Sequence, residues 1–153
     1  MKGDYVWALD ISMSSTGVAI FKNMKLIDVF HISTNPKELI QERLCEIANV
    51  LFEYKEKYPP FTIVMERGFT RFNTATQVIY RVVGLVNYLF ANCEQIYIAP
   101  KKIKMIVTGK GNSKKEIVAK KILEIYNVSC ATLDESDAIA IGYTYFKENG
   151  DIV

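Results

Sequence analysis

The sequence predicts an α/β fold: a five-stranded mixed sheet flanked by helices on both faces. Three β-rich runs follow one another at the start of the chain, and two further β-rich runs then alternate with helical patterns. Strands joined by short turns pair antiparallel, whereas strands joined through helices pair parallel. In addition, residues 61–65 form a continuous apolar run, which is typical of a strand buried on both faces.

The first three strands are expected at residues 5–11, 16–22 and 26–33. A turn rich in Ser, Thr and Gly separates the first two strands, and residues 22–25 turn the chain into the third. Because both connections are short, these strands are expected to form an antiparallel meander.

The first helix is expected to begin near Asn35 and Pro36, which are residue types favoured at the N-cap and at the first helical position. Apolar residues then recur at helical spacing as far as Tyr58, and two prolines end the pattern. The remaining elements are expected in this order: a strand at 61–65, a helix at 73–91, a strand at 95–99, a short basic helix at 101–107, and two helices that open with capping-box patterns at Ser113 and Thr132 and run to about Tyr126 and Phe146.

Length and composition indicate one globular domain, residues 1–153. Half of the residues are hydrophobic and 24% are charged, and no apolar run approaches the ~20 residues of a membrane span. The first residues run directly into a predicted strand, so we expect no signal peptide. The three cysteines, Cys45, Cys93 and Cys130, have neither disulfide-framework nor zinc spacing. We therefore expect a cytoplasmic protein with reduced cysteines and no membrane partner.

Positive charge is concentrated in residues 101–121. This segment holds eight lysines and one acid, Glu116, whereas the whole chain carries a net charge of only +2. Such a block favours a surface that faces a polyanion. A solvated lysine-rich helix is the alternative.

Four carboxylates are placed so that they can meet at one edge of the sheet. Asp10 and Glu66 each lie at the end of an apolar strand, and Asp134 and Asp137 lie three residues apart in the first turn of the last helix. If the first and fourth strands are neighbours, Asp10 and Glu66 leave the sheet at the same edge. Acids in a first helical turn are also ordinary complements of the helix dipole.

Clustered carboxylates without a cation repel one another, so a purely structural role is difficult to sustain. Oxygen ligands from different elements are how proteins hold Mg²⁺, and two such ions can flank an in-line displacement at phosphorus. The sequence therefore predicts a two-metal phosphodiesterase site.

Four segments, in this order along the chain, resemble the successive motifs of RuvC-type Holliday junction resolvases, which belong to the RNase H/retroviral integrase superfamily. They are Asp10 with Gly17, Met-Glu-Arg-Gly-Phe at 65–69, the Lys- and Gly-rich stretch 104–115, and Asp-Glu-Ser-Asp-Ala-Ile-Ala-Ile at 134–141. The short chain, rich in Lys and Tyr, resembles a bacteriophage-encoded member, which would act in the cytoplasm of the host cell.

The resemblance implies an RNase H-like fold and a homodimer that nicks opposing strands of a four-way junction, with forks as further candidate substrates. It assigns Asp10, Glu66, Asp134 and Asp137 as ligands of two Mg²⁺ ions, for which Mn²⁺ can substitute, and it implies no nucleotide cofactor. It places Lys104 and Lys115 near the scissile phosphate and Phe69 at the position of an aromatic wedge. Further candidates for phosphate contact, chosen from charge and position, are Arg67, Arg71, Lys101, Lys102, Lys110 and Lys114.

One departure from the family pattern lies beside Asp10. Members usually carry Gly two residues after the first Asp, whereas this chain has Ile11 and Ser12. The only histidine, His31, lies in the third strand and is expected to be away from the acids. The helix at 73–91, with apolar residues on more than one side, is the candidate dimer interface.

Three alternatives remain open at this point. The first is a catalytically silent module that binds branched DNA through its lysines. The second is an RNase H acting on RNA/DNA hybrids. The third is a lobe of an actin-like kinase, which normally needs two lobes and a glycine-rich phosphate loop.

Overall fold

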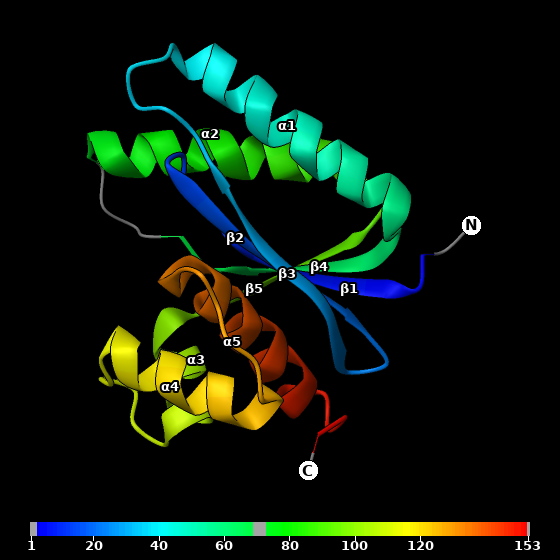
Figure 1. Cartoon of the computed structure of the whole chain (residues 1–153), viewed down its shortest axis with the longest axis vertical. Helices are drawn as coiled ribbons and strands as arrows, with labels where there is room; N and C mark the ends of the chain where they lie inside the picture. The colour runs from blue at the N-terminus through cyan, green and yellow to red at the C-terminus, as the bar shows by residue number, and fades with distance from the viewer. Residues whose placement is uncertain (1–2, 69–72, 153) are drawn as a thin grey trace.

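The computed structural model describes residues 3–68 and 73–152, in which helices cover both faces of a five-stranded sheet (Figure 1). The strands, in the order β3-β2-β1-β4-β5 across the sheet, are β1 (Tyr5–Asp10), β2 (Ser15–Lys22), β3 (Lys25–Ser33), β4 (Pro60–Glu66) and β5 (Glu94–Ile98). The helices are α1 (Ile40–Lys57), α2 (Thr74–Leu89), α3 (Pro100–Thr108), α4 (Lys115–Tyr126) and α5 (Leu133–Glu148).

The sheet is mixed, as the sequence predicts. The strands β1, β2 and β3 form the antiparallel meander, and β1 pairs parallel with β4, which pairs parallel with β5. The central strand β1 is therefore hydrogen-bonded on both sides. Its core residues Trp7, Ala8 and Leu9 are fully buried, which explains why the run lacks the polar alternation of a half-exposed strand.

Alternate residues of the strands point into two separate cores. Trp7 and Leu9 pack on α1 and α2, together with Ile47 and Val82, and Figure 1 shows these two helices on the same side of the sheet. The neighbouring strand residues, among them Ala8, pack on the opposite side against α3, α4 and α5.

Helix α5 lies directly against the sheet. It contacts β1, β2, β3 and β4 as well as α3 and α4, and most of its residues are buried. Gly142 permits this close approach, because a Cβ at that position would lie 2.3 Å from the ring of Phe21. The first turn of α5 is consequently held close to the sheet.

The predicted start of the first helix is wrong. Helix α1 begins at Ile40, after an N-cap at Leu39. Asn35 forms a turn instead, because its side-chain oxygen accepts a 3.0 Å hydrogen bond from the amide of Lys37. The side chain of Glu42 accepts a hydrogen bond from the amide of Leu39 and so satisfies a donor at the true start of the helix.

The two predicted capping boxes have different outcomes. Thr132 is the N-cap of α5, and its hydroxyl accepts a hydrogen bond from the amide of Glu135. The N-cap of α4 is Lys114 rather than Ser113. The Ser113 hydroxyl lies 2.6 Å from that of Thr108 and closes the preceding loop, so it is not available to cap the helix.

The cysteines are free thiols, as expected, although Cys45 is exposed rather than packed in the core. Among the described residues, no helix has the length and apolar character needed to cross a membrane.

Candidate active site

Asp10 and Glu66 end two neighbouring parallel strands. Leu9 in β1 pairs with Met65 in β4, so the residue after each leaves the sheet at the same edge. This is the edge at which sheets of this kind usually bind ligands. The expectation that the two carboxylates lie on adjacent strands is met.

The first turn of α5 brings Asp134 and Asp137 to Asp10. Carboxylate oxygens from these three residues lie within 4.8 Å of one another. Oxygen atoms at this spacing can share a divalent cation, which takes carboxylate ligands from several elements at once. The three residues therefore form an acidic group of the kind that holds a metal.

Gly17 is the reason that α5 can come so close. It pairs with Asp10 across β1 and β2, and a Cβ at Gly17 would lie 1.9 Å from the backbone oxygen of Asp134. Any other residue at this position would displace the first turn of α5.

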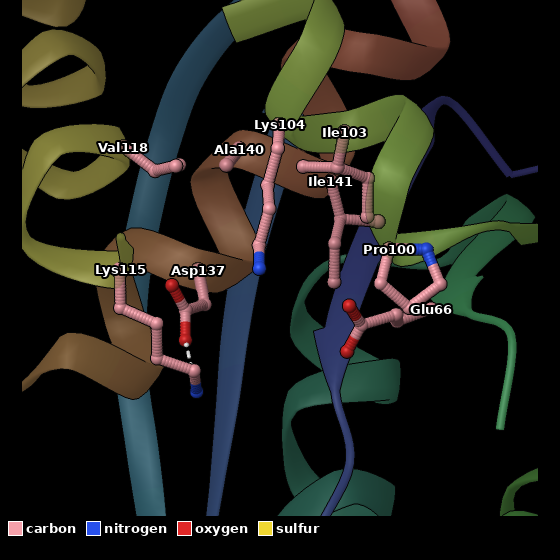
Figure 2. Close-up of a pocket in the computed structure, with 9 residues that line it drawn as sticks. All are labelled: Glu66, Pro100, Ile103, Lys104, Lys115, Val118, Asp137, Ala140 and Ile141. Atoms are coloured by element: carbon pink, nitrogen blue, oxygen red, sulfur yellow. Dashed lines mark hydrogen bonds and ion pairs between the residues drawn. The ribbon is translucent and has the colours of Figure 1, made fainter. Parts of the chain in front are cut away.

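Glu66 lies beside the acidic group and lines a small pocket of about 50 Å³. Figure 2 shows its carboxylate facing the space between β4 and α5, with the ammonium group of Lys104 directed between Glu66 and Asp137. The pocket is also lined by Lys115 and by the apolar side chains of Pro100, Ile103, Val118, Ala140 and Ile141. The charged groups are thus backed by an apolar wall.

Lys115 is the first residue of α4 and points at the same group. Its Nζ atom donates a 3.0 Å hydrogen bond to Oδ2 of Asp137 (Figure 2). The lysine side chain remains 62% exposed, whereas that of Asp137 is only 16% exposed. The ammonium group can therefore also be reached from solvent.

Burial and mutual repulsion make the acidic group costly to ionise. Burial, followed by the charges of Asp137 and Glu66, raises the pKa of Asp10 to about 8. Burial is also the main cause that raises the pKa of Glu66, with Asp137 adding to it. A cation bound at this site would therefore stabilise the ionised form of these carboxyls.

The same electrostatics appear in Asp137 and Lys115. Burial raises the pKa of the Asp137 carboxyl, against the opposing effect of Lys115. Burial alone would lower the pKa of Lys115, but its hydrogen bond to Asp137 and the surrounding negative charges outweigh this and raise it. Lys115 and Lys104 both lower the pKa values of Glu66 and Asp137 but only partly offset the burial of these acids, and the oxygen-rich donor set suits hard divalent cations.

A network of hydroxyl groups fixes the turn after Asp10. Ser12 exchanges hydrogen bonds with Ser15, and the buried Thr16 hydroxyl donates a 2.6 Å hydrogen bond to the backbone oxygen of Ser12. The buried guanidinium of Arg43 donates to Thr34, whose hydroxyl donates to the backbone oxygen of Met13. This turn therefore holds its shape without the glycine that the sequence lacks at position 12.

The predicted DNA-contact residues are placed as follows. Lys101 and Lys102 are exposed on α3, Lys110 and Lys114 are exposed in the loop between α3 and α4, and Arg67 is exposed after β4. Lys102 also forms an ion pair with Glu148. Phe69 and Arg71 lie outside the described residues.

His31 is closer to the acids than the sequence indicates. Its Nδ1 atom lies 2.7 Å from Oε1 of Glu135, the residue that follows Asp134. The capping-box spacing from Thr132 hides this contact, because it assigns the Glu135 side chain to its own helix. No local pattern in the sequence links His31 to Glu135, which lies 104 residues away.

The family of this chain is shown by one sequence match. The sequence profile described as crossover junction endodeoxyribonuclease RuvC matches residues 6–145, nearly the whole chain. The chain belongs to the RuvC family. Its RuvC relatives include the crossover junction endodeoxyribonuclease RuvC of Ehrlichia ruminantium strain Welgevonden, which is 33% identical over 144 residues, covering 87% of this chain and 90% of that protein. The RuvC of Pseudarthrobacter chlorophenolicus is 26% identical over 150 residues, covering 92% of this chain and 78% of that one.

Solved RuvC structures share the fold. The structure described as T. thermophilus RuvC in complex with Holliday junction substrate matches with a TM-score of 0.80 and 20% identity, covering 96% of each chain. The yeast mitochondrial Holliday junction resolvase Ydc2 matches with a TM-score of 0.68 and 13% identity, covering 98% of this chain and 82% of that one. These matches agree with the predicted RuvC-like, and hence RNase H-like, sheet and helices.

Proposed function

We propose that this protein is a structure-selective endodeoxyribonuclease that resolves four-way DNA junctions by paired, symmetric nicks. The observation that carries the proposal is the convergence of Asp10, Asp134 and Asp137, with Glu66 beside them, in a chain of the RuvC family. A solved relative is described in complex with a Holliday junction substrate, which supports four-way DNA as the substrate here. We also propose that residues 1–153 form one nuclease domain and that it acts in the cytoplasm.

Asp10, Glu66, Asp134 and Asp137 are proposed as the metal ligands. The four acids fit divalent cations because they supply only oxygen donors, and because burial and repulsion raise the pKa of Asp10, Glu66 and Asp137 and so disfavour their ionisation. When bound, two Mg²⁺ ions would supply Lewis-acid activation of water and stabilisation of the leaving 3′ oxygen, and Mn²⁺ would serve in their place.

The two lysines are proposed to face the scissile phosphate. Lys104 and Lys115 line the same pocket as Glu66 and Asp137. Their ammonium groups can therefore neutralise the oxygens of a phosphate that lies beside the acids. The positive surface is extended along α3 and the loop before α4 by Lys101, Lys102, Lys110 and Lys114, and Arg67 adds to it just after β4. Phe69 and Arg71 remain proposed DNA contacts on the sequence alone.

Paired nicks require two active sites, and we propose a homodimer formed through α2. The inner face of this helix packs in the core through Val82 and Val86, whereas Tyr80 and Tyr88 on the outer side are 49% and 80% exposed. Large aromatic side chains are enriched at protein interfaces. Sedimentation should therefore find a dimer at micromolar concentration, and a monomer there would contradict this interface.

The test uses end-labelled four-way junction, fork, linear duplex and RNA/DNA hybrid, each with and without Mg²⁺. We expect symmetric nicks in the junction that leave 5′-phosphate and 3′-hydroxyl ends, and no cleavage in EDTA. Asp10→Asn should abolish nicking but retain junction binding in a gel-shift assay. The matched control is Asp151→Asn, which changes an exposed acid just beyond the C-terminal end of α5, the end opposite Asp134 and Asp137, and should leave nicking unchanged.

Two outcomes would contradict the proposal. Salt-dependent junction binding with no nicking in Mg²⁺ or Mn²⁺ would identify a binding module. Cleavage of the RNA/DNA hybrid in preference to the junction would identify an RNase H activity.

A further inference from the structure

We propose that the His31–Glu135 pair positions the first turn of α5, and that His31 is a positioning residue for the metal site; this inference rests on the proposed function, because that function gives the site its ions. Neither residue is one of the four proposed metal ligands. The pair reaches the site through the backbone of α5.

Three residues in a row across the sheet define the geometry. Asp10 in β1 pairs with Gly17 in β2, and Gly17 pairs with His31 in β3. The first turn of α5 rests on the middle residue, because the backbone of Asp134 lies where a Gly17 side chain would be. The metal site therefore lies on the β1 side of this contact, and His31 lies on the β3 side.

Two consecutive residues of α5, Asp134 and Glu135, direct their side chains to these two sides. The Asp134 carboxylate belongs to the group with Asp10, whereas the Glu135 carboxylate turns to β3 and meets His31 at 2.7 Å. The first turn thus faces another carboxylate on the β1 side of Gly17. On the β3 side it is held to the sheet by a hydrogen bond between side chains.

Both carboxylate oxygens of the buried Glu135 side chain are hydrogen-bonded within the protein. This side chain is 8% exposed, and each carboxylate oxygen has a partner: Oε1 contacts His31, and Oε2 accepts a 2.8 Å hydrogen bond from the amide of Ala131. Because a carboxylate only accepts hydrogen bonds, Nδ1 of His31 is the donor. Removing the imidazole would leave a buried carboxylate oxygen without its partner, which is costly.

The pair matters because the acids repel one another. Carboxylate oxygens of Asp10, Asp134 and Asp137 lie within 4.8 Å of one another, and like charges this close repel one another. Repulsion of this kind favours a shift of the first turn of α5 away from β1. The hydrogen bond to β3 resists such a shift and keeps the ligands close enough to receive an ion.

The test compares three variants of the full-length protein in Mn²⁺ titration calorimetry and in junction nicking over a range of Mn²⁺. His31→Ala removes the donor, and His31→Asn keeps a donor nitrogen near the position of Nδ1. Val29→Ala is the matched control, because Val29 lies two residues away on the same face of β3 and packs against the core under α5. It weakens the packing without touching the pair.

We expect His31→Ala to raise the Mn²⁺ Kd by about 3- to 10-fold, which is less than the ~10–100-fold typical of residues hydrogen-bonded directly to metal ligands. Half-maximal nicking should need more Mn²⁺ by the same factor, while the rate at saturating Mn²⁺ returns close to that of the wild type. His31→Asn should restore most of the affinity. Val29→Ala should lower the melting temperature and leave the Kd unchanged.

The proposal is overturned if His31→Ala binds Mn²⁺ as the wild type does, or if Val29→Ala weakens binding equally. Its failure differs from failure of the proposed function. A wild-type protein that binds Mn²⁺ but nicks no branched DNA refutes only the function, whereas nicking with an unchanged Mn²⁺ requirement in His31→Ala refutes only the positioning role. A wild-type protein that binds no Mn²⁺ refutes both.

Discussion

Gly17 and Asp134 touch through their backbones, and a Cβ at Gly17 would lie 1.9 Å from the Asp134 carbonyl oxygen. Two segments more than a hundred residues apart in the sequence thus meet with no side chain between them. The contact sets the height of α5 above the sheet, and with it the place of the acids that α5 carries.

Gly17→Ala should therefore destabilise the fold by roughly 2–4 kcal/mol, because the added methyl group cannot be accommodated without lifting α5. Urea denaturation measures the change, and Mn²⁺ calorimetry should show weakened binding in the protein that remains folded. Gly84→Ala serves as the control, since a Cβ at Gly84 meets nothing within 4 Å and alanine is favoured in helices by about 1 kcal/mol. Equal stability of Gly17→Ala and wild type would contradict the close contact.

Asp10→Asn should stabilise the metal-free protein, increasingly so as the pH rises from about 4 to about 8. Burial raises the pKa of Asp10 from its ordinary value of 3.8 to about 8, so between these values the unfolded chain ionises while the folded protein keeps the proton. The stability of the wild type consequently falls with pH across this window, whereas asparagine has no such cost.

The difference should level off above pH 8 at roughly 1–3 kcal/mol. Thermal unfolding in EDTA at several pH values measures it. Added Mg²⁺ should reduce or reverse the difference, because the ion stabilises only the protein that binds it. A difference that does not change with pH would contradict the raised pKa.

Lys115→Ala should reduce the rate of nicking by about 10²-fold, as expected for the loss of one preorganised charged group at a reacting phosphate. Lys115 lowers the pKa values of both Asp10 and Glu66, so its removal should also shift the rising limb of the pH–rate profile to higher pH. Lys120→Ala, which removes an exposed lysine from the same helix, should leave the rate and the pH profile nearly unchanged. Equal effects of the two variants would contradict a specific role for Lys115.

Thr16→Val should destabilise the protein by about 1–2 kcal/mol, because it leaves the backbone groups of Ser12 without their partner in the turn after Asp10. The shapes of valine and threonine are similar, so packing changes little. Thermal unfolding measures the loss. Thr108→Val is the comparison variant, because it removes a hydroxyl hydrogen-bonded at the end of α3 and in the loop that follows. Thr16→Val should lower the nicking rate more than Thr108→Val, because only Thr16 lies in the turn beside Asp10.

The sequence alone predicts the sheet and the neighbouring strand ends that carry Asp10 and Glu66, because both follow from local patterns. Short turns and helical crossovers determine which strands run parallel, and strand ends then place the carboxylates. The four acids remain assigned as ligands by proposal, and the roles of Phe69 and Arg71 stay predictions, as does a bacteriophage origin.

Other features depend on contacts between distant residues and escape a local pattern. Asn35 has the residue type of an N-cap but bonds within a turn, so α1 begins at Ile40. Glu135 has the spacing of a capping box, yet its side chain bonds to His31 in another element. The missing glycine at position 12 is compensated by Thr16, Arg43 and Thr34, none of which is adjacent to it in the sequence.

Helix α5 carries two of the acids and is also the helix that packs on four of the five strands. A segment with this burial opens only when the whole domain unfolds, so its backbone amides should be among the slowest in the protein to exchange with deuterium. The proposed ligands Asp134 and Asp137 are therefore expected to keep their place on the helix when DNA binds. Any adjustment to the shape of the substrate must come from the DNA, from the loops around the site or from the second subunit.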